Sequence, residues 1–557
     1  MLSNKELSRA FRLASQLMEL HDENPFKVRS LQNASFKIDK STELLSALSE
    51  SELSSMEGIG KSTAAKIISL NQQGTFSDLE ELFARTPKGV IEMLSIKGIG
   101  PKKVRSLWKE LGIESVGELL YACNENRLVE LKGFGAKTQE QVRQAIEYAI
   151  SNEGKFHYAT VELEATRLLQ YLEEKQVAEK ISFTGSLRRK CEVLESGELI
   201  ATDEQWDHLS QHISDYLEGQ AEVKSTEDRL RFLSNEGIPV EIIKASRERF
   251  EEILFHTTAS QQHLDWLKTN RPEATWTGTN ETAIYASVGL PYLEPEFREG
   301  MFEDRWLQKG VLPIAVEYVD LKGTLHNHST YSDGMHTLEE MANYCKSMGF
   351  DYLGICDHSQ SAFYANGLKP DRILKQHEEI DRLNARLAPF HIFKGIESDI
   401  LIDGSLDYAD DVLASFDFIV ASIHSVLRMD KEKATNRIIK AVEHPRTTIL
   451  GHPTGRLLLA REGYPLDMEK VIDACAANGV VMELNANPYR LDLDWRYIPY
   501  ALEKGVMISI NPDAHRKEGY HDMHYGVCVA RKGGLEKQMT FNCFDLETVK
   551  AHFKKRK

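Results

Sequence analysis

Short apolar runs alternate with longer amphipathic stretches from about residue 320 to the end of the chain. Each run has the length of a buried strand, and each ends in a polar side chain. The stretches between them, such as 338–348 and 466–477, have the length and pattern of helices. This alternation predicts an α/β barrel, in which the carboxyl ends of the strands meet at one face. We therefore expect these polar side chains to lie together.

Histidine predominates at these strand ends. Thirteen of the 19 histidines lie after residue 320, and histidine is the commonest transition-metal ligand. His326 and His328 are two residues apart on one predicted strand, which places both imidazoles on the same face. A single histidine of this kind is usually structural, but six histidines and three carboxylates at seven strand ends predict a metal site.

The same part of the chain resembles the PHP (polymerase and histidinol phosphatase) family, also through the runs GHPTGRLLLAR, ELNANPYRLDL and DAH. The resemblance implies a distorted (β/α)7 barrel that holds two or three metals. The family's ligands correspond to His326, His328, Asp333, His358, Glu397, His424, His452, Asp513 and His515.

This ligand set predicts the chemistry of phosphate-ester hydrolysis. Mixed histidine and carboxylate ligands suit Mn²⁺ or Zn²⁺, with Fe²⁺ as a further option. Close metals activate water for in-line attack, so no protein nucleophile is required. We expect Glu397 to bridge the metals and Glu397, Asp513 and His515 to be catalytic. Arg456 and Arg490, just past strand ends, either contact substrate phosphate or form loop salt bridges.

Three Gly-x-Gly turns repeat in the N-terminal third, each between two helical patterns. Free N–H groups at the start of the second helix can bind a phosphate. The repeats resemble helix-hairpin-helix motifs and predict nonspecific binding to the DNA backbone, although three turns that only pack would give the same pattern. The predicted DNA-binding residues are Gly58, Gly60, Gly98, Gly100, Lys102, Gly133 and Gly135.

The runs NPFKVRSLQNASFKI and GIGKSTAAKIISLNQQGTF resemble the small N-terminal domain of family X DNA polymerases. Several members of that family carry a lysine here that forms a Schiff base with an abasic sugar, and Lys66 occupies the position. Lyase chemistry requires a lowered lysine pKa. The alternative is a helix lysine that contacts phosphate.

The family X resemblance continues in the middle of the chain. Residues 183–189 match its G-S-x-R-R nucleotide loop, which implies a nucleotide site at Gly185, Ser186, Arg188 and Arg189. The run FEEILFHTTASQQHLDWLK resembles a later family segment, but alanine and glutamine replace its glycine and lysine.

The catalytic carboxylates of that family are altered here. Its D-x-D pair falls on Ser196-Gly197-Glu198, and its third carboxylate falls on Glu241. Mg²⁺ requires near-ideal octahedral geometry, so a serine and two longer glutamates predict a core that polymerises poorly or not at all. Glu192 or Glu195 could substitute if the register shifts.

Composition restricts these interpretations. The net charge is −17, and residues 1–150 contain 20 basic and 20 acidic side chains, so any DNA binding there depends on backbone donors more than on net charge. Seven dispersed cysteines, no apolar run of membrane-spanning length and no signal-like start predict a cytoplasmic protein.

Together these patterns predict a helical region at 1–85 and helix-hairpin-helix motifs at 86–150. They also predict a degenerate α+β polymerase β-like palm and thumb at 151–312 and a PHP barrel at 313–557. We expect a DNA-repair phosphoesterase: a 3′→5′ exonuclease, with AP endonuclease or 3′-phosphatase action as options. Its partner would be gapped or nicked DNA or a 3′ end, with no membrane or obligate protein partner. The alternatives are an active family X polymerase that uses Mg²⁺, a non-catalytic DNA-binding scaffold and a small-molecule phosphatase.

Overall fold

In the computed structural model, the chain folds into two compact units, residues 1–153 and residues 154–557. Each unit is described separately. Among the described residues, every helix is too short or too polar to cross a membrane. The described residues are 2–41, 43–56, 58–96, 98–125, 127–131, 133–202, 206–272, 275–308, 310 and 312–555.

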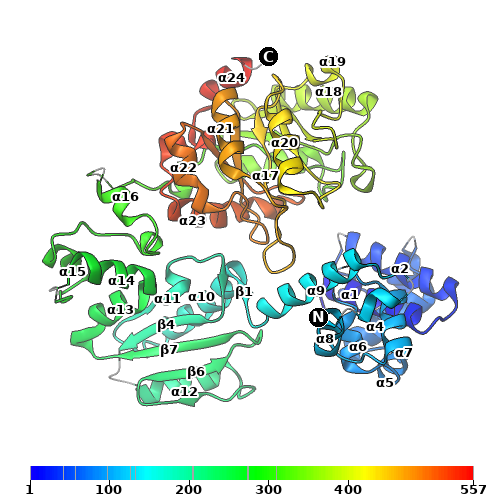
Figure 1. Ribbon diagram of the computed structural model, residues 1–557, viewed down its shortest axis with the longest axis horizontal. Helices are drawn as coiled ribbons and strands as arrows, with labels where there is room; N and C mark the ends of the chain where they lie inside the picture. Colours follow the sequence, from blue (N-terminus) through cyan, green and yellow to red (C-terminus); the bar gives the residue numbers. More distant parts are fainter. Residues whose placement is uncertain are drawn as a thin grey trace. The chain divides into compact units, whose positions relative to one another are not determined.

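The first unit is helical (Figure 1). Its first helix begins at a capping box, in which Ser3 and Glu6 satisfy each other's backbone N–H groups. Leu7, Phe11 and Met18 follow at helical spacing and are buried in the core of this unit. Its α-helices are α1 (Asn4–Leu20), α2 (Pro25–Lys40), α3 (Glu50–Ser55), α4 (Lys61–Gln73), α5 (Ser77–Ala84), α6 (Lys88–Met93), α7 (Pro101–Leu111), α8 (Val116–Asn124) and α9 (Ala136–Ser151).

The second unit begins with a mixed sheet, which we call the palm sheet. Its strand order is β2-β4-β7-β6-β5, and only β4 and β7 are parallel. The strands are β2 (Ile181–Phe183), β4 (Gly197–Thr202), β5 (Lys224–Ser225), β6 (Arg229–Leu233) and β7 (Pro239–Ala245), beside a pair formed by β1 (Phe156–His157) and β3 (Val193–Leu194). The accompanying helices are α10 (Tyr158–Glu174), α11 (Gly185–Arg188), α12 (Trp206–Tyr216), α13 (Phe250–Thr258), α14 (Gln261–Asn270), α15 (Glu281–Ser287) and α16 (Glu303–Gln308).

A seven-stranded parallel sheet forms the C-terminal part, in the order β14-β13-β12-β11-β10-β9-β8. A parallel bridge between Asn327 and Ala514 joins its two edges, so the sheet is a nearly closed barrel. The strands are β8 (Gly323–Thr324), β9 (Tyr352–Ile355), β10 (His391–Asp399), β11 (Phe418–Ser422), β12 (Ile449–Leu450), β13 (Val481–Asn485) and β14 (Ile508–Asn511).

Helices follow the barrel strands in alternation and surround them (Figure 1). They are α17 (Leu338–Ser347), α18 (Pro370–Leu387), α19 (Asp410–Leu413), α20 (Lys431–Val442), α21 (Met468–Asn478), α22 (Ile498–Glu503), α23 (Met523–Lys532) and α24 (Leu546–Lys555). Phe553 of α24 stacks on Phe418 at the start of β11, with 4.9 Å between ring centroids, and closes the amino end of the barrel. A functional site can therefore form at the opposite end of the barrel, where the carboxyl ends of the strands lie. The helical, mixed α/β and barrel folds expected from the sequence are confirmed.

Buried polar contacts join the palm sheet to the barrel within the second unit. Lys532 is 1% exposed; its ammonium donates to the Arg189 carbonyl oxygen over 2.9 Å and also pairs with Glu299. Trp495 donates its indole N–H to Glu192 over 2.9 Å. A buried charge without a partner is costly, so these pairs hold the junction in one arrangement.

Candidate metal centre

The predicted ligand side chains converge at the carboxyl ends of the barrel strands. They form overlapping groups in which one donor atom per residue lies within 4.8 Å of the others. The groups are His326 with His328 and Asp513; His328 with Asp333, His358 and His515; and His358 with Glu397 and His424. Because His328 and His358 belong to two groups each, the centre can hold neighbouring cations.

Glu397 lies at the middle of this cluster and is 1% exposed. Its Oε1 lies 3.3 Å from His326 Nε2, 3.1 Å from His424 Nε2 and 3.0 Å from His452 Nε2. Its Oε2 lies 2.9 Å from His358 Nδ1. His452 therefore joins the cluster through Glu397, which occupies the position expected of a bridging carboxylate.

Several ring and carboxylate atoms of the cluster lack hydrogen bonds. Among the described residues, no hydrogen-bond partner is found for His326 Nε2, His358 Nδ1 or Glu397 Oε2, although all three are buried. His358 Nδ1 and Glu397 Oε2 are 2.9 Å apart, but their geometry does not form a hydrogen bond. A buried polar atom without a partner costs about 1–3 kcal/mol. Such atoms aimed at one another fit a shared divalent cation, so the residues present suit the expected metals.

Two further carboxylates orient the cluster's histidines. Glu483 of β13 accepts from His326 Nδ1 over 2.7 Å, and Asp399 of β10 bonds His424 Nδ1 over 2.5 Å. A carboxylate on the far nitrogen fixes which nitrogen faces a metal and raises its basicity. Sequence reasoning assigned neither residue a role. The sequence did indicate Glu483, because it is a polar residue that follows the apolar run at the start of β13.

Asp357 holds the turn that presents Asp333. Its carboxylate accepts from the backbone N–H and hydroxyl of Ser329, at 2.8 and 2.6 Å. It also accepts from Ser332, with a backbone bond of 3.1 Å, and from the Gln376 amide over 2.6 Å. Burial raises the pKa of Asp357, while these bonds favour its charged form. This residue was also missed, because its partners come from separate segments.

Carboxylates at the centre of the cluster are held charged by the histidines around them. Burial opposes the charge of His326, His424 and His515, but nearby carboxylates raise the pKa of each. Burial opposes charge on Glu397 and Asp513, but surrounding histidines hold both pKa values well below their ordinary range. Burial and the neighbouring His515 and His358 lower the pKa of His328 to about 3. Neutral His328 therefore keeps a lone pair available for a cation.

The two arginines proposed for substrate phosphate differ in their surroundings. Arg456 donates to Asp494 over 2.6 Å and to the Arg490 carbonyl oxygen over 3.0 Å, so it ties the loop together. Arg490 places its Nε 4.0 Å from Asp513 Oδ2. Of the pair, Arg490 is the one at the cluster.

The three Gly-x-Gly turns of the first unit have one geometry. The first glycine is left-handed at each turn, and the second is the N-cap of the following helix. The φ angles are 84° at Gly58, 94° at Gly98 and 91° at Gly133; Gly60, Gly100 and Gly135 cap α4, α7 and α9. A Cβ on any of the capping glycines would meet no atom within 4 Å, so the space in front of these helix starts is open.

The two lysines named with these turns lie on the helices that follow. Lys102 is exposed in the first turn of α7. Lys66 of α4 pairs with Asp78 over 2.7 Å. This ion pair engages the Lys66 side chain within the first unit.

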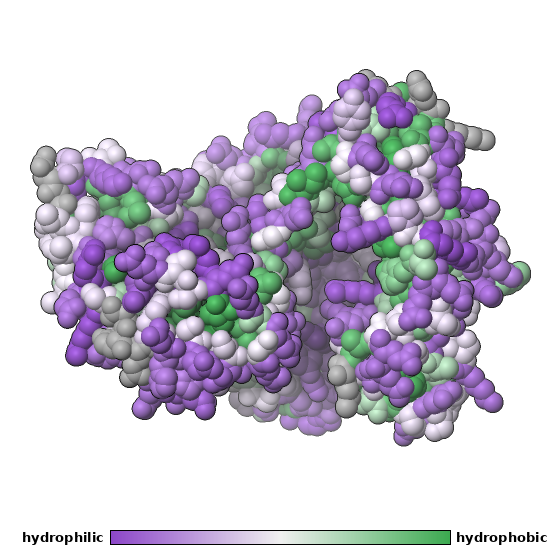
Figure 2. All heavy atoms as spheres, turned by 90° about the horizontal axis from the view of Figure 1, so that it is seen from below, coloured by the Kyte–Doolittle hydropathy of each residue, from purple (hydrophilic) through white to green (hydrophobic). Residues whose placement is uncertain are grey.

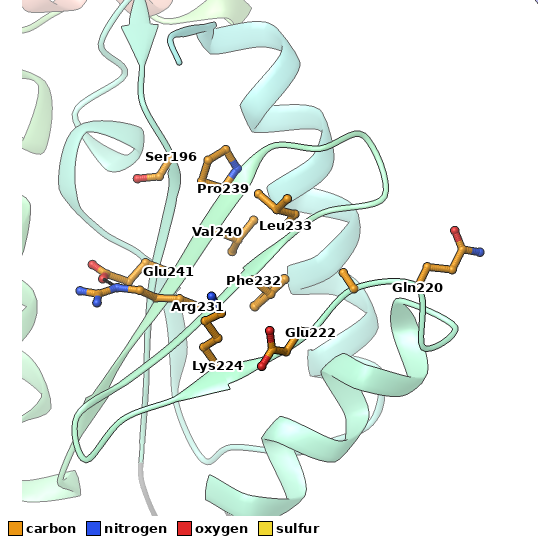
Figure 3. A pocket seen from close by; sticks show the side chains of 11 residues that line it. Ser196, Gln220, Glu222, Lys224, Arg231, Phe232, Leu233, Pro239, Val240 and Glu241 are labelled. Carbon is orange, nitrogen blue, oxygen red and sulfur yellow. Dashed lines mark hydrogen bonds and ion pairs between the residues drawn. The ribbon is translucent and has the colours of Figure 1, made fainter. Parts of the chain in front are cut away.

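The palm carboxylates are engaged by other parts of the palm. Glu198 and Glu241 face each other across β4 and β7. Glu241 accepts from Arg229 and Arg231 over 2.5 and 2.6 Å, and Figure 3 shows it against Arg231. Glu198 accepts from the backbone N–H and hydroxyl of Ser186, at 2.8 and 2.7 Å.

The other residues of the expected nucleotide loop also have protein partners. Arg188 forms a bidentate ion pair with Glu281, and Arg189 pairs with Glu299 over 3.1 Å. A Cβ on Gly185 would collide with the Glu198 carboxylate, which therefore covers this turn. The alternative ligand Glu192 is bonded to Trp495 of the barrel, and Glu195 is exposed.

Comparison with known proteins finds three family models that match stretches of the chain. The family described as "Helix-hairpin-helix domain" matches residues 2–76, "SAM-like Helix-hairpin-helix tandem" matches 90–147 and "PHP domain" matches 324–487. The chain is 34% identical to the "DNA polymerase/3'-5' exonuclease PolX" of Bacillus subtilis (strain 168) over the whole of both proteins.

Two further relatives match only part of this chain. A probable phosphatase of Thermoanaerobacter sp. (strain X514) is 26% identical over 42% of this chain and 94% of its own length. A probable phosphatase of Acetivibrio thermocellus is 29% identical over 34% of this chain and 78% of its own length.

Proposed function

The chain belongs to the bacterial PolX family, and from that premise we propose that its barrel is a metal-dependent phosphoesterase that removes nucleotides from DNA 3′ ends. The observation that carries the proposal is the convergence of six histidines and three carboxylates around buried Glu397. We further propose these nine residues as the ligands of two or three divalent metals, with Mn²⁺ or Zn²⁺ favoured by the mixed donor set and Fe²⁺ also compatible.

The proposed roles follow from position. Close divalent cations, when bound, supply an activated water and positive charge on the phosphate oxygens. Glu397 contacts both His326 and His358, which belong to different groups of the cluster. Asp513 and His515 supply further donors, whose nearest atoms are 3.7 Å apart. Glu483 and Asp399 keep His326 and His424 oriented. Arg490 is placed to bind a substrate phosphate beside Asp513.

DNA is the proposed substrate because of the first unit. Gly60, Gly100 and Gly135 leave open space at three helix starts, which is what backbone binding of phosphates requires. The full-length relative is described as both a DNA polymerase and a 3′-5′ exonuclease. Gapped, nicked and free 3′ ends are the proposed forms; AP endonuclease and 3′-phosphatase action use the same chemistry.

We propose that the palm does not polymerise. Ser196 offers no carboxylate, two arginines neutralise Glu241, and Glu198 occupies the donors of Ser186 that a triphosphate would need. Two Mg²⁺ ions require carboxylates that are free to bind them. Lyase chemistry at Lys66 is left out of the proposal, because Asp78 already engages this side chain in an ion pair.

One experiment tests the proposal against its alternatives. Gapped DNA labelled at the 5′ end is incubated with the whole protein and Mn²⁺, then with Mg²⁺ and deoxynucleoside triphosphates. We expect shortening and no extension. Extension that disappears in a Glu198→Ala, Glu241→Ala variant would establish a polymerase instead.

Binding measurements separate the remaining alternatives. Gly60→Val and Gly100→Val place a side chain in open space, so they should preserve the fold but block approach of the DNA backbone. A scaffold would lose DNA binding in these variants and hydrolyse nothing with any metal. A small-molecule phosphatase would hydrolyse phosphate monoesters equally well in native and variant forms.

A further inference from the structure

Two exposed aromatic side chains lie on one loop beside the metal cluster. Phe363 is 86% exposed and Tyr364 is 71% exposed, in the short helical turn Phe363–Ala365 that follows β9. Exposed rings of this size cost hydrophobic free energy unless a ligand covers them. In the view of Figure 2, hydrophilic residues predominate and hydrophobic ones form separate patches.

The loop is rigid although its two rings are exposed. Ser361 anchors it to Asp407 through a 2.6 Å backbone bond and to Asp399 through a 2.7 Å hydroxyl bond. Ala362 and Ala365 on either side of the rings are 0% and 1% exposed. The buried parts hold the turn, so Phe363 and Tyr364 are presented without the entropy cost of ordering a mobile loop.

Tyr364 is adjacent to the cluster itself. Its ring centroid lies 6.2 Å from that of His358, one of the converging side chains. Burial and the nearby carboxylates of Asp399, Glu397 and Asp333 raise the pKa of its hydroxyl, while Arg490 opposes them. The Tyr364 ring therefore borders the candidate metal centre.

We infer that Phe363 and Tyr364 form a stacking platform for the unpaired bases of a DNA 3′ end. The inference rests on the proposed function. Every base has a flat face that stacks on an aromatic ring, so such a platform holds a strand without reading its sequence. A phosphodiester at the cluster then brings its own bases to the two rings, while a paired base would first have to leave its duplex.

The test compares Phe363→Leu, Tyr364→Leu and the double variant on a single-stranded oligonucleotide with Mn²⁺. We expect KM to rise about tenfold for each ring, as ~1.4 kcal/mol of stacking implies, while kcat stays within about twofold. Tyr364→Trp should restore a low KM. Val319→Ala is the matched control, because Val319 is 77% exposed but precedes β8 at the other end of the barrel.

A second substrate ends in two abasic tetrahydrofuran nucleotides, which offer the bond but no bases. Here we expect native protein and leucine variants to have the same KM. With 2-aminopurine at the 3′ end and no metal, native protein should change the fluorescence on binding and the double variant should not.

The failures are distinguishable. Equal KM values for native and variant protein on ordinary DNA, or an equal rise on abasic ends, would overturn the platform while leaving the phosphoesterase intact. Absence of hydrolysis of both substrates by the native protein would overturn the proposed function, and this inference with it.

Discussion

Carboxylates in the palm sheet and in the barrel have opposite surroundings. Glu241 of the palm faces two arginines, and Glu198 accepts from both donors of Ser186. Glu397 of the barrel is surrounded by histidine nitrogens, and its Oε2 has no hydrogen-bond partner among the described residues. The palm carboxylates have charges and donors that replace a metal, whereas the barrel carboxylate has neighbours that can share one.

This difference lies in the residue types that surround each carboxylate. An arginine is always charged and forms a planar pair with a carboxylate, so it competes permanently with a cation. A histidine can be neutral and then contributes a lone pair to the same cation. Arg188 pairs with Glu281, and both Arg189 and Lys532 pair with Glu299. These ion pairs lie in the palm and at its junction with the barrel.

The largest expected effect comes from removing a barrel ligand. His326→Ala should lower Mn²⁺-dependent shortening of end-labelled DNA by about 10³-fold or more, because cations at such a centre are worth several kcal/mol. Metal content measured on the purified variant should fall in parallel. His444→Ala is the control, since His444 pairs with Asp410 away from the cluster. If His326→Ala digests DNA as fast as the native protein, the barrel cluster is not the metal site that drives digestion.

The junction between palm and barrel should respond to acid. Burial opposes the charge of Glu296, but Lys190 and Arg531, at 2.8 and 2.9 Å, hold its pKa at about 2. A lowered carboxyl pKa stabilises the folded state above the ordinary value of 4.5, and this contribution is lost as the pH falls from 4.5 toward 2. It amounts to about 3 kcal/mol at neutral pH.

The measurement is the free energy of unfolding of the second unit against pH, for native protein and Glu296→Gln. The two curves should be separated at pH 7 and should approach each other as the pH falls from 4.5 toward about 2. A separation that does not change with pH would mean that the charge of Glu296 contributes nothing. Lys554→Gln, near the end of α24, is a control for loss of one charged group.

A smaller effect is expected from the carboxylate behind His326. Glu483→Gln keeps the size of the side chain but weakens the 2.7 Å contact to Nδ1. Metal affinity or exonuclease rate should fall about 10- to 100-fold. Titration of the metal-free protein with Mn²⁺ separates weaker binding from slower chemistry. If neither changes, Glu483 is only a packing residue.

The smallest effect should come from the palm glutamates. Glu198→Ala, Glu241→Ala should leave exonuclease activity within about twofold and change stability by about 1 kcal/mol, because the arginine partners are partly exposed. Primer extension should be absent before and after the change. A loss of exonuclease activity as large as that of His326→Ala would show that the two regions act together in catalysis.

Much of the barrel could be predicted because its pattern is local. Alternation of strand and helix predicts where carboxyl ends meet, and His326, Glu397 and Asp513 each follow an apolar run. Their convergence follows from topology without detailed packing. Glu483, Asp399 and Asp357 could not be assigned in this way, because a residue that orients another is identified only by contacts between distant segments.

The palm shows the limit most clearly. The sequence by itself gives a serine at 196 and glutamates at 198 and 241, and it determined the class of each fold. Only the tertiary structure decided the partners: the register of β6 against β7 brings Arg229 and Arg231 to Glu241, and the packing of α23 brings Lys532 to Glu299. Residue identity and periodicity are properties of the chain, whereas the partner of a charge depends on which distant segments fold against it.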